Sequence, residues 1–221
     1  MPLRVTGGPS RISMTDAEKR PLLQRVCASP RVYVADGFAT AAEVTHVIER
    51  AERLERHPPS GLEATRGVAG FAFEMPVAGD TVLSQLCDAI YIALGFGNVC
   101  GDTVRFRRYE RGNSHPAHCD VYEIAGAHLV ATAIVYLNDA DGGATFFAEA
   151  EGGALSIDPQ LGRLAVWLQP HVGQRRGVAH GSMSGVRRMR RVALLPDSAH
   201  ATSVLPATVI RCDVSTTIHL P

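Results

Sequence analysis

The chain has no excess of charge of either sign, because its 221 residues contain 22 lysines plus arginines and 22 aspartates plus glutamates. A formal net charge of zero gives no broad electrostatic attraction for nucleic acid or for an anionic membrane, so we expect neither as a partner. The five cysteines include no pair spaced as CxxC, which argues against a disulfide framework and against a zinc site.

The sequence also lacks long apolar runs. None approaches the roughly 18–20 residues that cross a bilayer, and the first residues show no apolar core of a signal peptide. We therefore expect a cytoplasmic protein, whose oligomeric state the sequence leaves open. Apolar residues still make up 46% of the chain, enough for a sizeable core, and the length suits one domain.

Two amphipathic helices are expected in the first half. Thr40 and Glu43 form a T-x-x-E capping box, and apolar residues follow at helical spacing. A second helix is expected from Val82 to Leu94, where the apolar residues again recur with a helical period. The alternating residues 31–35 predict a strand, and the Gly- and Pro-rich residues 58–79 are interpreted as a loop.

The second half has a different character. From residue 101 onward, short β-type runs recur between Gly, Asp, Asn or Pro. The expected strands are 103–109, 129–137, 144–148, 155–157, 163–168, 178–180, 191–195 and 204–210. Many short strands after two helices predict a mainly β fold with supporting helices, either a sandwich or a barrel.

The expected organisation is an N-terminal arm followed by one domain. We interpret residues 1–29 as the arm, with a short helix near residues 16–26, and residues 30–221 as the domain. Within that domain, residues 30–100 are expected to form a helical support, and residues 101–221 the β core.

The densest group of potential metal ligands is His115-Pro-Ala-His118-Cys-Asp120. On a strand, residues i and i+2 project from the same face, so His118 and Asp120 can reach one metal ion. Two histidines and a carboxylate on one face of an octahedral ion leave three positions open, as in the non-haem iron(II) oxygenases. The third ligand has to come from a distant strand. Without it, the H-x-D tripeptide also fits a hydrogen-bonded surface pair.

Further motifs surround this group in a fixed order. They are Arg108-Tyr109-x-x-Gly112, His118-x-Asp120, Thr132, Tyr136-Leu137-Asn138-Asp139, Gly142-Gly143-Ala144-Thr145 with Phe147, Pro159-x-x-Gly162, and His180. Over residues 103–196, the chain thereby resembles the prolyl 4-hydroxylase-like branch of the 2-oxoglutarate/iron(II) dioxygenases. The resemblance implies a double-stranded β-helix (a cupin-like jelly roll) for the β core, with a metal site in its mouth.

The resemblance also implies a set of site residues. It makes His180 the third ligand, in preference to His171, so that His118, Asp120 and His180 would bind the metal and be catalytic. The implied cofactor is Fe(II), with 2-oxoglutarate and dioxygen as co-substrates, and ascorbate is allowed as a further reductant. Trp167 and Phe147 are expected to be core residues rather than a substrate platform.

The co-substrate contacts are assigned in the same way. A guanidinium meets a carboxylate with two parallel hydrogen bonds, which suits the far carboxylate of 2-oxoglutarate. Arg190 and Arg191 both lie where the family places this basic residue. Only one of them can point inward, because successive strand residues face opposite ways. We favour Arg191. Tyr109, Tyr136 and Thr145 match positions of hydroxyl donors to 2-oxoglutarate.

The function expected from the sequence is hydroxylation of an unactivated C–H bond. Asp120 supports hydroxylation, because related halogenases carry a small residue in its place. A small amino-acid-like or natural-product substrate is the leading interpretation, and a peptidyl-prolyl hydroxylase is the alternative. A nucleic-acid repair dioxygenase is disfavoured by the charge. A non-catalytic, metal-binding jelly-roll module is the rival from another class, although such a module needs no co-substrate anchor.

Overall fold

The computed structural model describes most of the chain, and only the backbone in some of its strands. The described residues are 20–95, 102–120, 123–124, 127–169, 179–182, 189–192, 194–195 and 208–216. Backbone alone is described for 123–124, 127–128, 182 and the ranges from 189 onward.

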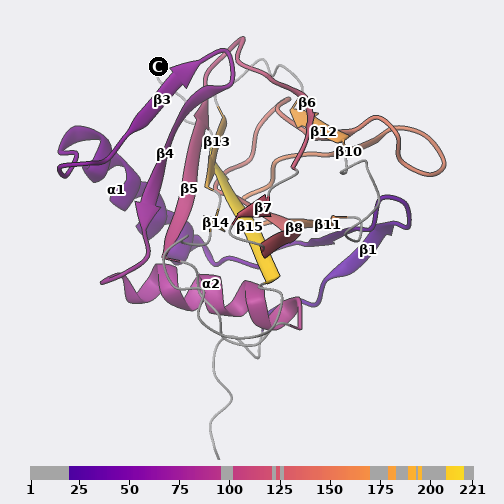
Figure 1. The fold of residues 1–221 in the computed structure, drawn as a ribbon, viewed down its shortest axis with the longest axis horizontal. Coiled ribbons are helices and arrows are strands. Elements are labelled where there is room, and N and C mark those ends of the chain that lie inside the picture. The colour runs from indigo at the N-terminus through magenta and orange to yellow at the C-terminus, as the bar shows by residue number, and fades with distance from the viewer. Residues whose placement is uncertain are drawn as a thin grey trace, which may run out of the picture.

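The described elements are mostly strands (Figure 1). They are β1 (Gln24–Cys27), β2 (Val32–Ala35), α1 (Ala41–Arg56), β3 (Ala64–Gly67), β4 (Gly70–Pro76), α2 (Thr81–Ala93), β5 (Thr103–Tyr109), β6 (His115–Cys119), β7 (Glu123–Ile124), β8 (Ala127–Tyr136), β9 (Thr145–Phe147), β10 (Leu155–Ile157), β11 (Leu164–Leu168), β12 (Ala179–Ser182), β13 (Met189–Val192), β14 (Leu194–Leu195) and β15 (Thr208–Thr216). The prediction of a mainly β fold with supporting helices is confirmed.

The strands form two sheets. The larger one runs in the order β1-β2-β11-β8-β15-β13-β5-β4-β3, with β7 paired to β8 and β14 paired to β5. The smaller one runs β10-β9-β12-β6. Both sheets draw strands from distant parts of the chain, so residues far apart in sequence meet between them.

Both helices lie where the sequence places them, and each begins at a capping residue. The capping box is confirmed, since the Thr40 side chain accepts from the Glu43 N–H while Glu43 accepts from the Thr40 N–H. The α2 helix begins after Asp80, whose carboxylate accepts from the Leu83 N–H at 2.9 Å. These contacts satisfy backbone donors that a helix leaves unpaired at its start.

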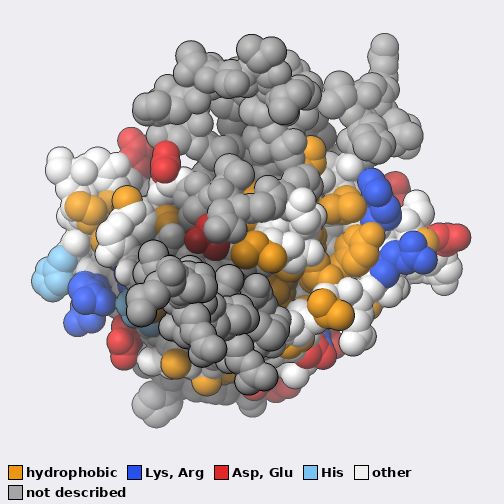
Figure 2. All heavy atoms as spheres, turned by 90° about the horizontal axis from the view of Figure 1, so that it is seen from below, with side chains coloured by type: hydrophobic (Ala, Val, Ile, Leu, Met, Phe, Trp, Pro, Cys, Tyr) orange, Lys and Arg blue, Asp and Glu red, His pale blue; other side chains and the backbone are white. Residues whose placement is uncertain are grey.

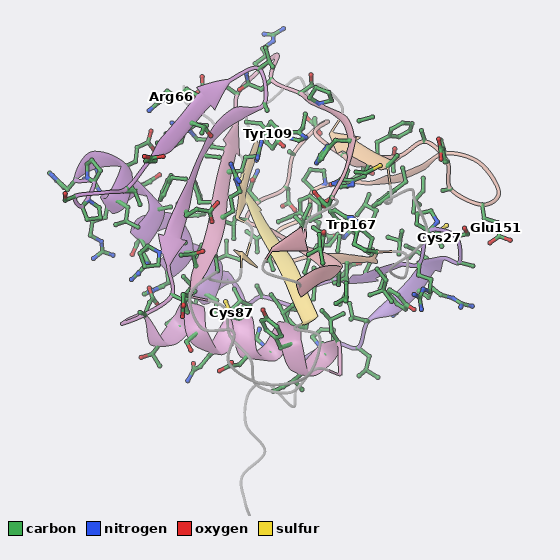
Figure 3. All side chains as sticks on the ribbon, in the orientation of Figure 1. Cys27, Arg66, Cys87, Tyr109, Glu151 and Trp167 are labelled. Atoms are coloured by element: carbon green, nitrogen blue, oxygen red, sulfur yellow. The ribbon has the colours of Figure 1, made fainter. Side chains whose placement is uncertain are left out.

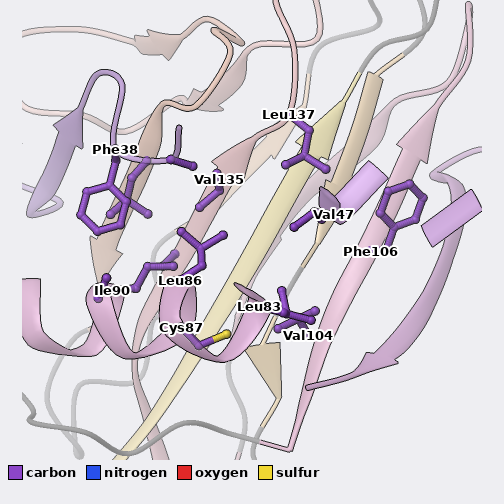
Figure 4. Close-up of a cluster of buried hydrophobic side chains, with 14 of the residues drawn as sticks. Phe38, Val47, Leu83, Leu86, Cys87, Ile90, Val104, Phe106, Val135 and Leu137 are labelled. Atoms are coloured by element: carbon purple, nitrogen blue, oxygen red, sulfur yellow. The ribbon is translucent and has the colours of Figure 1, made fainter. Parts of the chain in front are cut away.

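The helices cover one face of the larger sheet. Val47 of α1 and Leu83, Leu86 and Ile90 of α2 are buried against sheet residues that include Phe106 (Figure 4). Burial of each such aliphatic side chain stabilises the fold by roughly 1.5–3 kcal/mol. Because this face is sealed by helices, the opposite face of the sheet is the one left to meet the smaller sheet.

Side chains on that opposite face form a second buried cluster. It contains Ile134 and Tyr136 of β8, Trp167 of β11 and Phe147 of β9. Alternate residues of β8, such as Val135, belong to the helix-side cluster instead. The β8 strand is therefore buried on both faces, which explains why its sequence reads as an almost continuous apolar run.

Two predictions about the first half are wrong. Residues 58–79 are not simply a loop, because β3 and β4 form a hairpin there and β4 pairs with β5. Phe71, Phe73 and Met75 alternate along β4 and face the helices, a two-residue period that the neighbouring Gly and Pro residues obscured. The region from 30 to 100 is thus not a purely helical support, since its strands extend the main sheet.

The N-terminal arm also differs from the expectation. The described part begins at residue 20, and β1 pairs with β2 where the end of a helix was expected. The arm up to residue 29 therefore contributes a strand to the domain, and its residues 1–19 lie outside the described ranges.

No helix in the described ranges is long and apolar enough to cross a membrane. On the face shown in Figure 2, acidic and basic side chains lie side by side along the edge, with no large patch of one sign among the coloured residues.

Candidate metal centre

His118 and His180 face each other across two antiparallel strands. The β6 and β12 strands pair so that these two residues are direct Cα partners, and their ring centroids lie 4.4 Å apart. Gly181 permits this close approach, because a Cβ there would lie 3.0 Å from the His115 carbonyl oxygen and 3.1 Å from the Ala117 nitrogen. The sequence separates the histidines by 62 positions (180 − 118), and strand pairing brings them together.

Asp120 completes a cluster of three potential ligands. It follows directly after β6 and is 2% exposed. Its Oδ1 lies 3.5 Å from the Nε2 of His118, and its Oδ2 lies 3.4 Å from the Nε2 of His180. The ligand atoms of the three residues all lie within 4.8 Å of one another.

This donor set fits a divalent iron ion. Two imidazole nitrogens and one carboxylate oxygen converge from two neighbouring strands, and this ligand combination is typical of non-haem iron(II) sites with open coordination positions. Burial of Asp120 and His180 also fits, since buried charged groups in proteins are paired with an opposite charge or coordinate a metal ion.

A polar chain behind Asp120 was not anticipated. The Thr132 hydroxyl donates to Oδ2 of Asp120 at 2.8 Å, and the Gln169 side-chain amide donates to the Thr132 hydroxyl oxygen at 3.2 Å. Thr132 was recognised only as part of a motif. The available signal was a polar residue inside an otherwise apolar strand, which normally needs a buried partner.

His115 lies beside the candidate ligand His118. It is the first residue of β6, and its Nδ1 lies 2.9 Å from the Nδ1 of His118. The same nitrogen of His118 lies 2.9 Å from the Pro116 carbonyl oxygen. These contacts occupy the Nδ1 side of His118 and leave its Nε2 directed toward Asp120.

Aromatic rings enclose His180 on the inner side. The Trp167 ring centroid lies 4.4 Å from that of His180, and the Phe147 centroid lies 5.4 Å from that of Trp167. Trp167 lies in the interior of the molecule (Figure 3) and is 0% exposed. Both aromatic residues are core residues, as expected. They keep water from this side of the cluster, which strengthens electrostatic interactions there.

Two of the three expected hydroxyl donors lie together. The Tyr136 hydroxyl is 2.6 Å from the Thr145 hydroxyl, and both residues are fully buried between the sheets. Tyr109 lies elsewhere, at the end of β5 (Figure 3), where the Arg107 guanidinium approaches its ring at 6.0 Å from the centroid.

The side chains of Arg190 and Arg191 lie outside the described structure, as does His171. The backbone register of β13 is described. Arg191 pairs with Arg107 and with Ser215, whereas Arg190 pairs with Arg108. Paired residues share a face of the sheet. Residues that are paired side by side across neighbouring strands are called a row below. Arg191 therefore holds a position in the row of Arg107, and Arg190 one in the row of Arg108.

The two rows have different surroundings. Arg108 contacts Glu55 of α1 and the Phe71 ring, so its row faces the helix layer. Arg107 lies two residues from Tyr109 and one from Phe106, so it occupies the other face, which the helices leave uncovered.

Comparisons with known proteins agree with this architecture. The structure is similar to the crystal structure of a Pseudomonas putida prolyl 4-hydroxylase, with a TM-score of 0.51 and 20% identity over 73% of this chain and 89% of that chain. It is also similar to a viral collagen prolyl hydroxylase of Paramecium bursaria Chlorella virus 1, solved as its 2-oxoglutarate complex, with a TM-score of 0.55 and 20% identity over 76% of this chain and 95% of that chain.

Sequence similarity points the same way. A probable prolyl 4-hydroxylase 4 and a prolyl 4-hydroxylase 2, both from Arabidopsis thaliana, are each 28% identical over 143 residues, which cover 58% of this chain and 47% of the relative. The chain is prolyl 4-hydroxylase-like in sequence and in fold. The double-stranded β-helix expected for its core is thereby confirmed.

The sequence similarity covers only part of the curated relatives. This prolyl 4-hydroxylase-like chain spans about half the length of the curated relatives it matches. No family model matches it. The activity, substrate and partners of the whole protein therefore have to be argued from the site.

Proposed function

We propose that this protein is an Fe(II)- and 2-oxoglutarate-dependent dioxygenase that hydroxylates a prolyl ring within a peptide. The observation that carries the proposal is the convergence of His118, Asp120 and His180 at the paired strands β6 and β12. The ligand set matches the requirement of dioxygen chemistry for vacant coordination positions.

Each residue has a role that follows from its position. His118, Asp120 and His180 would hold Fe(II), which supplies dioxygen activation when bound together with 2-oxoglutarate. The contacts at Nδ1 of His118 orient its ring so that Nε2 is available to the metal. Trp167 and Phe147 exclude water beside His180.

The co-substrate would bind farther into the β core. The hydroxyls of Tyr136 and Thr145 are bonded to each other, so one of the two would donate to a carboxylate of 2-oxoglutarate. The register supports Arg191 rather than Arg190 as the cation for the far carboxylate, because its row faces away from the helices. Tyr109 is two residues from Arg107 along β5, on the same face of the sheet, and is the third candidate donor.

The substrate assignment rests on the relatives. The four relatives described above carry prolyl hydroxylase or prolyl 4-hydroxylase in their names, and one of them is a collagen prolyl hydroxylase. They support the peptidyl-prolyl alternative over the small amino-acid-like or natural-product substrate, which stays a prediction without support of its own.

A substrate panel tests the proposal. Purified protein is incubated with Fe(II), 2-oxoglutarate and either proline-rich peptides, free proline or other free amino acids, and succinate is measured together with a mass gain of one oxygen. We expect both signals with the peptides, none with Asp120→Ala, and competition by oxalylglycine against 2-oxoglutarate. Turnover of free amino acids alone would reverse the substrate assignment.

A binding experiment separates an enzyme from a non-catalytic module. Fe(II) and 2-oxoglutarate are mixed with the protein without oxygen, and we expect a weak visible charge-transfer band from co-substrate chelation of the metal. Absence of both the band and succinate formation would show that the fold retains a metal site without the proposed activity.

A further inference from the structure

We propose that Gln169 and Thr132 form a relay that positions the carboxylate of Asp120 for the metal, so that both residues determine metal affinity without touching the ion. This inference rests on the proposed function, because it takes Asp120 to be a metal ligand. The two hydrogen bonds that carry it measure 3.2 Å, from Gln169 to Thr132, and 2.8 Å, from Thr132 to Asp120.

The relay has a fixed direction. A side-chain amide N–H can only donate, so the bond from Gln169 uses the Thr132 hydroxyl oxygen as an acceptor. The single hydroxyl proton of Thr132 is then free to be donated to Oδ2 of Asp120. Hydrogen bonds linked in this way polarise one another, and a bond to a charged carboxylate is the stronger kind.

Burial makes the relay hard to replace. Thr132 is 0% exposed, Asp120 is 2% exposed and Gln169 is 6% exposed. Solvent is therefore poorly placed to supply the hydrogen bond that Thr132 provides, and a buried acceptor that loses its donor is destabilised.

Asp120 needs such support because of its place in the chain. It lies one residue beyond the end of β6, where the strand ladder of the smaller sheet stops. Thr132 belongs to β8 of the larger sheet, and Gln169 follows β11 and donates its backbone N–H to the Val130 carbonyl at 2.8 Å. The relay thus ties a ligand from the smaller sheet to the framework of the larger one.

The relay also sets the rotation of the carboxylate. Oδ2 accepts from Thr132 and lies 3.4 Å from the Nε2 of His180. Oδ1 consequently lies on the other side, 3.5 Å from the Nε2 of His118. Loss of the hydroxyl would remove this restraint on rotation about the Cβ–Cγ bond, so the carboxylate oxygens would be held less firmly in the arrangement that faces the two histidines.

The test compares metal binding by four variants with that by the wild type. Thr132→Val removes the hydroxyl but keeps a side chain of similar shape, and Thr132→Ser keeps the hydroxyl. Gln169→Leu removes only the amide that donates to Thr132. Val166→Ala truncates a buried β11 side chain on the helix side and serves as a control for destabilisation. Co(II) is titrated without oxygen, and binding is followed by fluorescence of Trp167, the single tryptophan of the chain.

We expect Thr132→Val to weaken Co(II) binding by about 10- to 100-fold, the range typical of lost outer-shell support. Thr132→Ser should bind nearly as the wild type does, and Gln169→Leu should fall between them. Val166→Ala should have a lower melting temperature with unchanged affinity. Thermal melts of the metal-free proteins show whether stability accounts for any difference.

The outcomes separate the inference from the proposed function. Equal Co(II) affinity in the wild type and in Thr132→Val would overturn the relay and leave the proposed function standing, as would loss in Thr132→Val without rescue by Thr132→Ser. A graded loss of Co(II) affinity together with no effect of 2-oxoglutarate on the Fe(II) spectrum would support the relay and refute the proposed function. Failure of the wild type to bind metal would refute both.

Discussion

His118 and His180 are direct partners across the β6–β12 pair, with ring centroids 4.4 Å apart. The Nε2 atom of each ring already lies close to a carboxylate oxygen of Asp120, at 3.5 Å for His118 and 3.4 Å for His180. The site is thus defined by strand register. A slip of one residue would turn one of the histidines to the opposite face of the small sheet. The candidate metal site and the pairing of two short strands therefore depend on each other.

The first prediction concerns the three ligands. His118→Ala, Asp120→Ala and His180→Ala should each abolish Fe(II)-dependent succinate formation, because each removes one of the three side chains proposed to bind the metal. Circular dichroism should show that the fold is kept. Normal activity in His180→Ala, combined with loss in His171→Ala, would move the third ligand to His171.

The second prediction concerns the co-substrate anchor. Loss of a charge-assisted pair in a desolvated pocket costs roughly 2–5 kcal/mol, which corresponds to a rise of about thirtyfold or more in the half-saturation concentration of 2-oxoglutarate. We expect this for Arg191→Ala, whose row in the sheet faces away from the helices.

Arg190→Ala provides the matched control, because its row faces the helix layer. It should leave the half-saturation concentration nearly unchanged, whatever it does to stability. The opposite pattern would assign the anchor to Arg190. Small equal effects would point to Arg187 or Arg188, the two other arginines of the same basic run.

The third prediction concerns the pH dependence of stability. Burial raises the pKa of Asp80, but the Leu83 N–H, His46 and Arg50 stabilise its charged form more strongly and hold the pKa below its usual range. A carboxyl group whose pKa is lowered by folding contributes stability above its unfolded pKa and loses it as the pH falls through the folded pKa.

Asp80→Asn should therefore lower the free energy of unfolding by about 1–3 kcal/mol at neutral pH, since asparagine can still cap α2 but carries no charge. The difference from the wild type should shrink as the pH falls below about 4, the usual pKa of an aspartate. Asp88→Asn, on the same helix, is the control. Urea unfolding at several pH values measures the effect, and a constant difference across this range would contradict it.

The fourth prediction separates structure from catalysis within the Arg108-Tyr109 motif. The Arg108 guanidinium is buried, donates to Glu55 of α1 at 2.6 Å through Nη2 and stacks over the Phe71 ring. Burial raises the pKa of Glu55, but the guanidinium groups of Arg108 and Arg66 outweigh it and lower that pKa. Arg108 therefore joins a helix to the sheet.

Glu55→Gln should lower the free energy of unfolding by about 1–2 kcal/mol, less than for a fully buried pair because Glu55 is partly exposed to solvent. The half-saturation concentration of 2-oxoglutarate should not change. Glu49→Gln on the exposed side of α1 should affect neither quantity. A selective loss of 2-oxoglutarate affinity in Glu55→Gln would instead place Arg108 in the site.

Local patterns in the sequence were sufficient for several features. The capping box at Thr40 and Glu43 located α1, and the strand at residues 103–109 was located to the residue, because caps and alternation act within a few positions. The H-x-D motif likewise identified two side chains that lie together, since their separation along a strand fixes their direction.

Tertiary structure decided the rest. The pairing of His180 with His118, the Gln169–Thr132 contact behind Asp120 and the burial of Arg108 against Glu55 all join residues that are at least 37 positions apart. The β3–β4 hairpin escaped detection because Gly and Pro around it signal turns, whereas its pairing with β5 holds it in the sheet. Local sequence determines which residues can form a strand or bind a metal. Which of them meet is determined by strand pairing and burial, which act between distant segments.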